Sequence, residues 1–273
     1  MIFPDYHLHS FFSSDSQAFV DDIIISAKNK GMSSMCITDH YDMDFPVLPS
    51  EPDMTFDLDT DKYLVYMNEV KDRYSKDFDF RIGVELGIMK ETQLKLHDYV
   101  EKYSQFDFII ASSHLVDGLD PYYPEYFQGK TEYEAYYHYF ETILDNVKNF
   151  KDYNVYGHLD YIFRYGPNKD SNFALSDYYD LFKDILETII YDGKGIEINT
   201  GSLYKGMSSP HPNIDILKLY KSLGGEIITV GSDAHKPDYV GYGFDIAKDI
   251  LLSNGFKYYT TFSNMKPGFK LIQ

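Results

Sequence analysis

Short apolar runs with the character of buried strands recur along the chain, separated by segments long enough to form helices. Two of these runs, Phe108–Ala111 and Ile227–Val230, are continuous stretches of apolar or β-branched residues with almost no polar interruption. Such runs are typical of strands that are buried on both faces of a parallel sheet. The predicted strands are Ile2–His7, Ser34–Thr38, Arg81–Glu85, Phe108–Ser112, Val155–His158, Gly195–Asn199, Glu226–Gly231 and Tyr258–Phe262.

The segments between these runs carry apolar residues at helical spacing. Val20–Lys30 is followed by Gly31, which can adopt the left-handed backbone that often ends a helix. The other predicted helices are Lys62–Tyr74, Thr92–Tyr103, Thr131–Phe150, Ser176–Tyr191, Asn213–Ser222 and Tyr242–Asn254. Alternating strands and helices predict an α/β fold built from βα units. The loop Tyr41–Asp61, which is rich in Pro and Asp, is long enough to have a function of its own.

Length and composition limit the class of protein. The chain has 273 residues, of which 44% are hydrophobic, and α/β barrels of this size often form one domain. We therefore expect a single domain over residues 1–273. The first residues lack the features of a signal peptide, and no apolar run approaches the ~18 residues of a membrane span. The single cysteine, Cys36, cannot form an internal disulfide, which fits a reducing cytoplasm.

The charge balance bears on the partners. The formal net charge is −18, and most of this excess of acid is expected on a solvated surface. Nucleic-acid surfaces need basic patches, so the balance argues against nucleic acid as a partner. It favours cationic or metal-bound small molecules. No membrane association and no obligate protein partner is evident in the sequence.

Polar side chains, most of them acidic or imidazole groups, follow the predicted strands at the points where the strands end. They are His7, His9, Asp39, His40, Glu85, His114, His158, Asn199, Asp233 and His235. The carboxyl ends of barrel strands converge on one face, where catalytic residues collect. Structural histidines have no reason to follow strand ends. One site at this face would explain all of these positions.

The spacing and type of these residues predict a metal-dependent hydrolase. In extended chain, residues two apart point the same way, so His7 with His9 and Asp233 with His235 form two candidate ligand pairs. Imidazole and carboxylate without thiolate suit Zn, Mn or Fe better than Ca or Mg. The candidates are too many for one ion with an open position. A carboxylate such as Glu85 can bridge two ions, which share a water and lower its pKa to near neutrality.

The same motifs resemble the polymerase and histidinol phosphatase (PHP) family, and within it the histidinol-phosphatase branch. The resemblance covers most of the chain and rests on Asp5–Ser10, Asp15, Ile37–His40, Gly83–Gly87, Ser112–His114, Gly157–Asp160, Glu197–Asn199 and Gly231–His235. It implies a distorted (β/α)7 barrel that holds three divalent metal ions. The eighth run, Tyr258–Phe262, must then lie outside the closed barrel or not be a strand.

The resemblance also implies a division of the ligands among the ions. The first ion would take His7, His9, Glu85 and Asp233, the second Glu85, His114 and His158, and the third Asp15, His40 and His235. Each of these positions holds a competent ligand, which favours a catalytic member of the family. Asp15 is the least secure by spacing, because it could equally cap the next helix.

A substrate and a reaction follow from the resemblance. It implies hydrolysis of L-histidinol phosphate to L-histidinol and phosphate, with attack by a hydroxide that bridges two ions. Among the three arginines, Arg164 alone lies beyond a strand end, and its guanidinium matches the geometry of phosphate. Ser202 and Lys205 are weaker candidates for the same contact. The leaving group could take its proton from a metal-bound water or from a nearby acid such as Asp160.

The ammonium and imidazole groups of L-histidinol phosphate would suit an acidic, aromatic mouth. Asp42 and Asp44, together with Tyr161 and Phe163, are placed to supply it. The remaining histidines, which are His97, His138 and His211, are expected to have structural, surface or loop roles.

Three other functions use similar chemistry. A PHP-type exonuclease or nucleotide phosphoesterase would hold the same ions, but it needs a basic channel, which the net charge of −18 disfavours. An amidohydrolase-type deaminase or lactonase also begins with a His-x-His pair, yet often bridges its ions with a carboxylated lysine where this chain has Glu85. A non-enzymatic metal-binding protein would not need the full ligand set.

Overall fold

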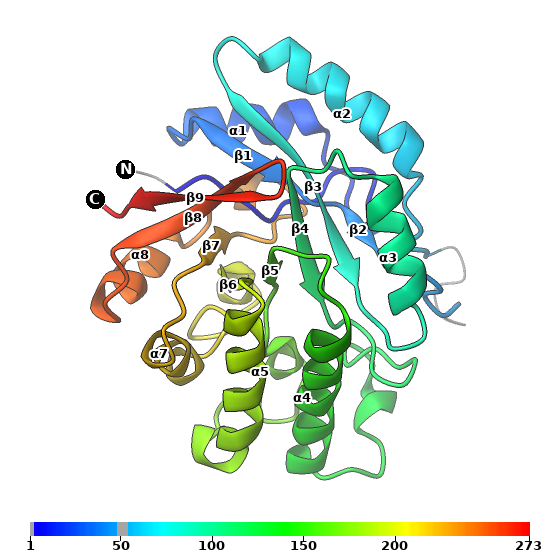
Figure 1. The fold of residues 1–273 in the computed structure, drawn as a ribbon, viewed down its shortest axis with the longest axis vertical. Coiled ribbons are helices and arrows are strands. Elements are labelled where there is room, and N and C mark those ends of the chain that lie inside the picture. The colour runs from blue at the N-terminus through cyan, green and yellow to red at the C-terminus, as the bar shows by residue number, and fades with distance from the viewer. Residues whose placement is uncertain (1–2, 48–53) are drawn as a thin grey trace.

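A curled parallel sheet forms the centre of the computed structural model, which describes residues 3–47 and 54–273 (Figure 1). Its strands, in spatial order, are β1 (Ser34–Ile37), β3 (Asp79–Gly87), β4 (Phe108–Ser112), β5 (Val155–Tyr156), β6 (Gly195–Asn199) and β7 (Ile228–Gly231). The short strand β2 (His40–Tyr41) also pairs with β3, and every one of these pairings is parallel. Ile2 and residues 48–53, which belong to the first predicted strand and the long loop, lie outside the described residues.

Residues 5–9 close this sheet into a ring. They bridge to β1 through Asp5 and Met35, and they bridge on the other side to the end of β7 through Leu8 and Ala234. Both bridges are isolated, so this part of the wall is irregular rather than a continuous strand. The ring therefore has seven members, and the predicted distorted (β/α)7 barrel is confirmed.

Helices surround the barrel (Figure 1). They are α1 (Val20–Asn29), α2 (Thr60–Tyr74), α3 (Gln93–Lys102), α4 (Glu132–Asn149), α5 (Tyr179–Tyr191), α7 (Ile214–Ser222) and α8 (Phe244–Ser253), close to the predicted segments. Helix capping and the spacing of apolar residues explain where such helices form. Thr131 and Glu134, for example, form a reciprocal capping box at the start of α4. Apolar residues at helical spacing on α5, such as Phe182 and Ile185, are buried against the core. Among the described helices, none is long and apolar enough to cross a membrane.

A terminal hairpin lies outside the ring. Strand β8 (Tyr258–Ser263) pairs antiparallel with β9 (Lys266–Leu271) in a separate two-stranded sheet. The Tyr6 hydroxyl donates a hydrogen bond to the Phe262 carbonyl at 3.0 Å, and the Phe262 amide donates to the same hydroxyl at 3.1 Å. Phe262 packs with Phe108 and Val155, which begin β4 and β5, and with the buried Cys36. The eighth predicted strand thus closes the amino-terminal end of the barrel.

Truncation of Phe262 to alanine is expected to lower the free energy of unfolding by about 3–5 kcal/mol, because it leaves a cavity in a closely packed core. The ring is 4% exposed and lies at the end of the barrel away from the strand ends that carry the candidate ligands. Denaturant unfolding monitored by circular dichroism measures the loss. Phe269→Ala on β9, where the ring is 50% exposed, is the matched control. Equal losses in the two variants would contradict the packing role of Phe262.

Candidate metal centre

The predicted ligands meet at one end of the barrel, where the parallel strands end. His7 and His9 lie on the segment that closes the ring, and Asp15 lies in the loop after it. The others lie on or just after strands, namely His40 on β2, Glu85 on β3, His114 after β4, His158 after β5, and Asp233 and His235 after β7. Convergence of strand ends therefore brings together residues that are far apart in the sequence.

Glu85 is at the centre of the group, with its two carboxylate oxygens facing different histidines. Its Oε2 lies 3.1 Å from His7 Nε2, 3.5 Å from His9 Nε2 and 3.0 Å from His40 Nδ1. Its Oε1 lies 2.9 Å from His158 Nε2 and 3.3 Å from His114 Nε2. The carboxylate is completely buried. This is the arrangement that a carboxylate shared by two cations requires.

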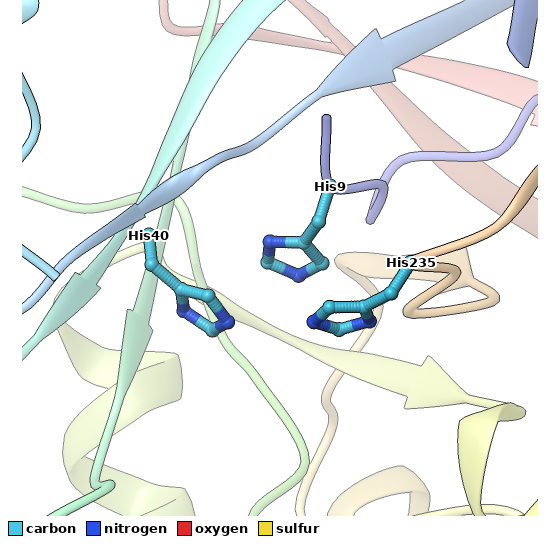
Figure 2. A group of neighbouring side chains, drawn as sticks. All are labelled: His9, His40 and His235. Atoms are coloured by element: carbon cyan, nitrogen blue, oxygen red, sulfur yellow. The ribbon is translucent and has the colours of Figure 1, made fainter. Parts of the chain in front are cut away.

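Asp15 forms a third group with two histidines. Its Oδ2 lies 3.0 Å from His235 Nε2 and 3.7 Å from His40 Nε2. Figure 2 shows the rings of His40 and His235 on either side of His9, with ring centroids 4.1 and 4.2 Å from that of His9. His9 therefore lies between the first and third groups. The alternative role of Asp15 as a helix cap is wrong, because α1 begins at Val20 with Phe19 as its capping residue.

Asp233 links the histidines to the cationic side of the site. Its Oδ1 lies 3.4 Å from His9 Nε2 and 3.8 Å from His7 Nε2, while its Oδ2 accepts a hydrogen bond from Arg164 Nη2 at 3.0 Å. The backbone of Asp233 has φ +54°, a left-handed conformation that is uncommon outside glycine. Such conformations cluster at functional sites, where the surrounding structure holds them in place.

The pKa values of the candidate ligands are strongly shifted, and those of the histidines are shifted in both directions. Burial alone raises the pKa of Glu85, but the imidazoles of His7, His40 and His114 hold it well below its usual range. Burial lowers the pKa of His158 to about 4 and that of His9 well below its usual value. Against the effect of burial, neighbouring carboxylates raise the pKa of His7 and His114 well above its usual value and that of His40 to about 8. Neutral imidazoles and ionised carboxylates are the forms that bind metals.

One buried atom of the group is available to bind a cation. His9 Nε2 is buried and makes no hydrogen bond with any described residue, and its nearest carboxylate oxygens lie 3.4 and 3.5 Å away. A buried polar atom without a partner is costly. A metal ion among Glu85, Asp233 and this nitrogen would satisfy it, so the residues present fit the ions that the sequence predicts.

Carboxylates behind the histidines fix their orientation. Glu197 lies 2.7 Å from His7 Nδ1, and Asp42 lies 2.7 Å from His114 Nδ1, so that each ring directs its Nε2 toward Glu85. Such partners set the tautomer of a metal-binding histidine. Asp42 was predicted as a contact for the substrate ammonium group; it does line the cavity, but its Oδ1 is engaged by His114. The role of Glu197 was missed, although its alternation with Asn199 on β6 marks both residues as neighbours.

Arg164 is held by a chain of buried groups. Its Nη2 donates to Asn199 Oδ1 at 3.0 Å as well as to Asp233, and its Nε donates to His211 Nε2 at 3.1 Å. His211 in turn donates from Nδ1 to Asp160 Oδ1 at 2.6 Å. His211 was expected to have a loop role, and its contact with Arg164 was not predicted. The sequence also offered another role for Asp160. It proposed Asp160 as an acid for the leaving group, but Asp160 is 1% exposed, lies behind His211 and does not line the cavity.

The site opens into a cavity of about 470 Å³. The described part of the loop Tyr41–Asp61 contributes Phe45, Met54 and Phe56 to its wall, which fits the functional role predicted for that loop. The remaining lining consists of candidate ligands, cations, acids and tyrosines, namely Asp15, His40, Asp42, His114, Asp120, Tyr122, Tyr123, His158, Tyr161, Arg164, Tyr165, Lys205, Asp233 and His235. The ligands lie at the base of a space that suits a small molecule.

The other predicted substrate contacts divide between the cavity and the protein interior. Tyr161 and Lys205 line the cavity, and burial lowers the pKa of Lys205 to about 8. Ser202 is completely buried and its hydroxyl donates to the Ser209 carbonyl, so it is not placed to touch a ligand.

The two remaining residues of the predicted mouth lie elsewhere. Phe163 is completely buried in the core, and Asp44 is at the surface, 2.8 Å from Lys95 Nζ. His97 and His138, as expected, pair with surface carboxylates.

Comparisons with known proteins agree with this geometry. Residues 5–201 match the PHP domain family. The chain is 32% identical to the histidinol-phosphatase of Lactococcus lactis over 263 residues, which cover 96% of this chain and 95% of that protein. A crystal structure of histidinol phosphate phosphatase from L. lactis, in complex with zinc, L-histidinol and phosphate, matches with a TM-score of 0.86 and 32% identity, covering 97% of this chain and 98% of the other. The structure of a putative histidinol phosphatase from Listeria monocytogenes matches with a TM-score of 0.78 and 19% identity, covering 89% of this chain and 99% of the other. At this identity it supports the fold alone.

Proposed function

Because the chain belongs to the PHP domain family, we propose that it is a histidinol-phosphatase, a metal-dependent enzyme that hydrolyses L-histidinol phosphate to L-histidinol and phosphate. The observation that carries the proposal is Glu85, which is buried among five imidazoles at the base of a cavity that Arg164 also lines. The histidinol-phosphatase of L. lactis matches this chain over nearly its whole length. The reaction belongs to histidine biosynthesis, and residues 1–273 would act as one phosphoesterase domain.

We assign the ligands to three divalent ions according to the three groups of side chains. His7, His9, Glu85 and Asp233 would hold the first, Glu85, His114 and His158 the second, and Asp15, His40 and His235 the third. Zinc is the ion in the L. lactis structure, and its preference for imidazole and carboxylate fits these ligands. Manganese and iron have compatible preferences.

The chain's own residues would position the substrate for attack by water. Bound divalent ions would supply a water that is deprotonated near neutral pH. Their positive charge would also balance the negative charge of the phosphate oxygens. Arg164 and Lys205 would add the cationic protein groups that phosphate binding needs. Asp233 fixes the Arg164 guanidinium from one side and His211 fixes it from the other. Asp160 supports His211, so we propose that it positions Arg164 rather than transferring a proton.

A phosphate-release screen tests this function directly. The protein is assayed against small phosphomonoesters while the metal content of the same sample is measured. We expect L-histidinol phosphate among the best substrates and bound zinc, manganese or iron in the active sample. If L-histidinol phosphate ranked below simple phosphomonoesters, the assignment would fail, although hydrolase activity could remain. Cleavage of single-stranded DNA that is faster than hydrolysis of L-histidinol phosphate would support the exonuclease alternative instead. A cytoplasmic location stays a prediction.

Replacement of His211 by alanine is expected to weaken phosphate binding by about 10-fold, because it removes a hydrogen bond to a charged group. The inhibition constant for inorganic phosphate should rise. The inhibition constant for L-histidinol should stay within about 2-fold of the wild-type value, since Arg164 would contact the phosphate and not the histidinol. Steady-state inhibition by each product measures both constants. His138→Ala, which removes an exposed histidine, is the control. A parallel loss of affinity for both products would show that His211 supports the whole site rather than Arg164.

A further inference from the structure

A second cavity, of about 610 Å³, lies at the end of the barrel where the strands begin, away from the candidate metal centre. The terminal hairpin forms one side of it, and the starts of β1 and β3 form the other (Figure 1). We call it the hairpin groove. Its polar lining includes Ser34 and Arg81 from the barrel and Ser263, Lys266 and Lys270 from the hairpin. The proposed phosphatase reaction makes no use of this groove.

The geometry of β9 turns two lysines toward the hairpin groove. Lys266 and Lys270 are four residues apart on this strand, so they lie on the same face, with Gly268 between them. All three residues line the groove. Because Gly268 has no side chain, the middle of the groove stays open between two cations that are roughly 13 Å apart along the strand.

Arg81 adds a third cation near one end of the hairpin groove. Its Nη1 donates a hydrogen bond to Ser263 Oγ at 2.5 Å, and its Nη2 donates to Asp79 Oδ2 at 2.9 Å. Ser263 lies directly opposite Lys266 in the hairpin, and such pairs share a face of the sheet. Arg81 and Lys266 therefore approach the same serine, whose hydroxyl proton is free to donate to an anion.

The positive charge of the hairpin groove is not balanced by the residues around it. Neither Lys266 nor Lys270 forms an ion pair or a side-chain hydrogen bond within residues 3–47 and 54–273. Among the described residues that line the groove, Asp79 is the one carboxylate, and it is engaged by Arg81. The whole chain has a net charge of −18, so two uncompensated cations in one groove contrast with the rest of the molecule. Such a groove attracts anions.

We propose that the hairpin groove binds a small molecule with two anionic groups. One group lies between Arg81 and Lys266 and accepts a hydrogen bond from Ser263. The other lies at Lys270, and the body of the molecule crosses the open space over Gly268. The groups recognised are anionic oxygens held by charged donors, which form the stronger class of hydrogen bond. This site is separate from the metal centre and does not depend on the proposed function.

A pair of ligands that differ by one charge tests the proposal. Biphenyl-4,4′-disulfonate and biphenyl-4-sulfonate are titrated by calorimetry into the zinc-loaded protein. Neither compound contains a phosphate ester that the protein could hydrolyse. We expect the disulfonate to bind at one site about 10-fold more tightly than the monosulfonate, the effect of one more hydrogen bond between charged groups. Added salt should weaken both, because it screens exposed charges.

Variants of the hairpin locate the site. Lys266→Gln/Lys270→Gln should lower the affinity for the disulfonate by at least about 10-fold, because it removes the two uncompensated cations. Lys76→Gln/Lys90→Gln is the matched control, since it removes the same charge from exposed positions outside the groove and should bind as the wild-type protein does. Lys266→Arg/Lys270→Arg keeps the charge and should retain the affinity.

A single substitution guards against damage to the hairpin. Lys270→Gln should remove the preference for the disulfonate over the monosulfonate, with a melting temperature equal to that of the wild-type protein. The proposal is overturned if the wild-type protein binds neither compound or binds both equally. It is also overturned if Lys266→Gln/Lys270→Gln binds the disulfonate as tightly as the control variant does, because the ligand would then lie elsewhere, as at the metal centre.

Discussion

Glu85→Gln is expected to lower kcat for phosphomonoester hydrolysis by about 1,000-fold. Replacing a residue that hydrogen-bonds to a metal ligand typically lowers activity or metal affinity by about 10- to 100-fold. Replacing a carboxylate that is shared by two ions should lower activity further. Glutamine keeps the size of the side chain, but it replaces one of the two oxygens that face the histidines with an amide nitrogen. It also removes the negative charge that the surrounding imidazoles stabilise.

The measurement is steady-state phosphate release, with metal content determined on the same samples. Glu85→Gln should bind fewer ions than the wild-type protein, whereas Glu69→Gln, which changes an exposed glutamate on α2, should match it in both respects. Near-normal turnover by Glu85→Gln would contradict the bridging role and, with it, the division of ligands among the ions.

Removal of the metal ions is expected to abolish activity and to lower the melting temperature by about 10 °C. Ions that bind only the folded protein stabilise it by about 4 kcal/mol at a thousandfold excess over the dissociation constant. In a protein of this size each kcal/mol corresponds to roughly 2–4 °C. The loss has a structural origin, because the ligand set is buried and the ions would provide a partner for His9 Nε2, which makes no hydrogen bond with any described residue.

Differential scanning fluorimetry before and after dialysis against a chelator measures this shift. Activity should return when zinc, manganese or iron is added, and the order of recovery ranks the ions. Magnesium or calcium should restore little, since imidazoles are poor ligands for them. Unchanged activity after complete removal of the ions would contradict a metal-dependent mechanism.

Most of the barrel could be predicted because its strands are buried on both faces and therefore read as continuous apolar runs. The irregular parts could not be predicted in the same way. Residues 5–9 make only isolated bridges, and β9, whose residues are mostly exposed, carries no apolar pattern that distinguishes it from a loop. The role of β8 as a cover for the barrel depends on the contact between Tyr6 and Phe262, which no local pattern reveals.

The metal centre was predictable because its residues follow strand ends, and strand ends converge. The substrate contacts follow no such rule. Residues Tyr161–Arg164 form a 3₁₀-helix, in which residues three apart lie on the same side. Tyr161 and Arg164 therefore both face the cavity, while Phe163 between them faces the core. The sequence placed Arg164 beyond a strand end, but it did not predict this helix or the way it separates the side chains.

The closure of the ring by residues 5–9 has a consequence for the order in which the enzyme matures. The segment that carries His7 and His9 is held by a hydrogen bond from the Tyr6 amide to the Val230 carbonyl and by a contact of Tyr6 with Phe262, 256 residues away. Contacts of such long sequence separation form late, because the intervening chain must be ordered first. We therefore expect His7 and His9 to join the other candidate ligands late in folding.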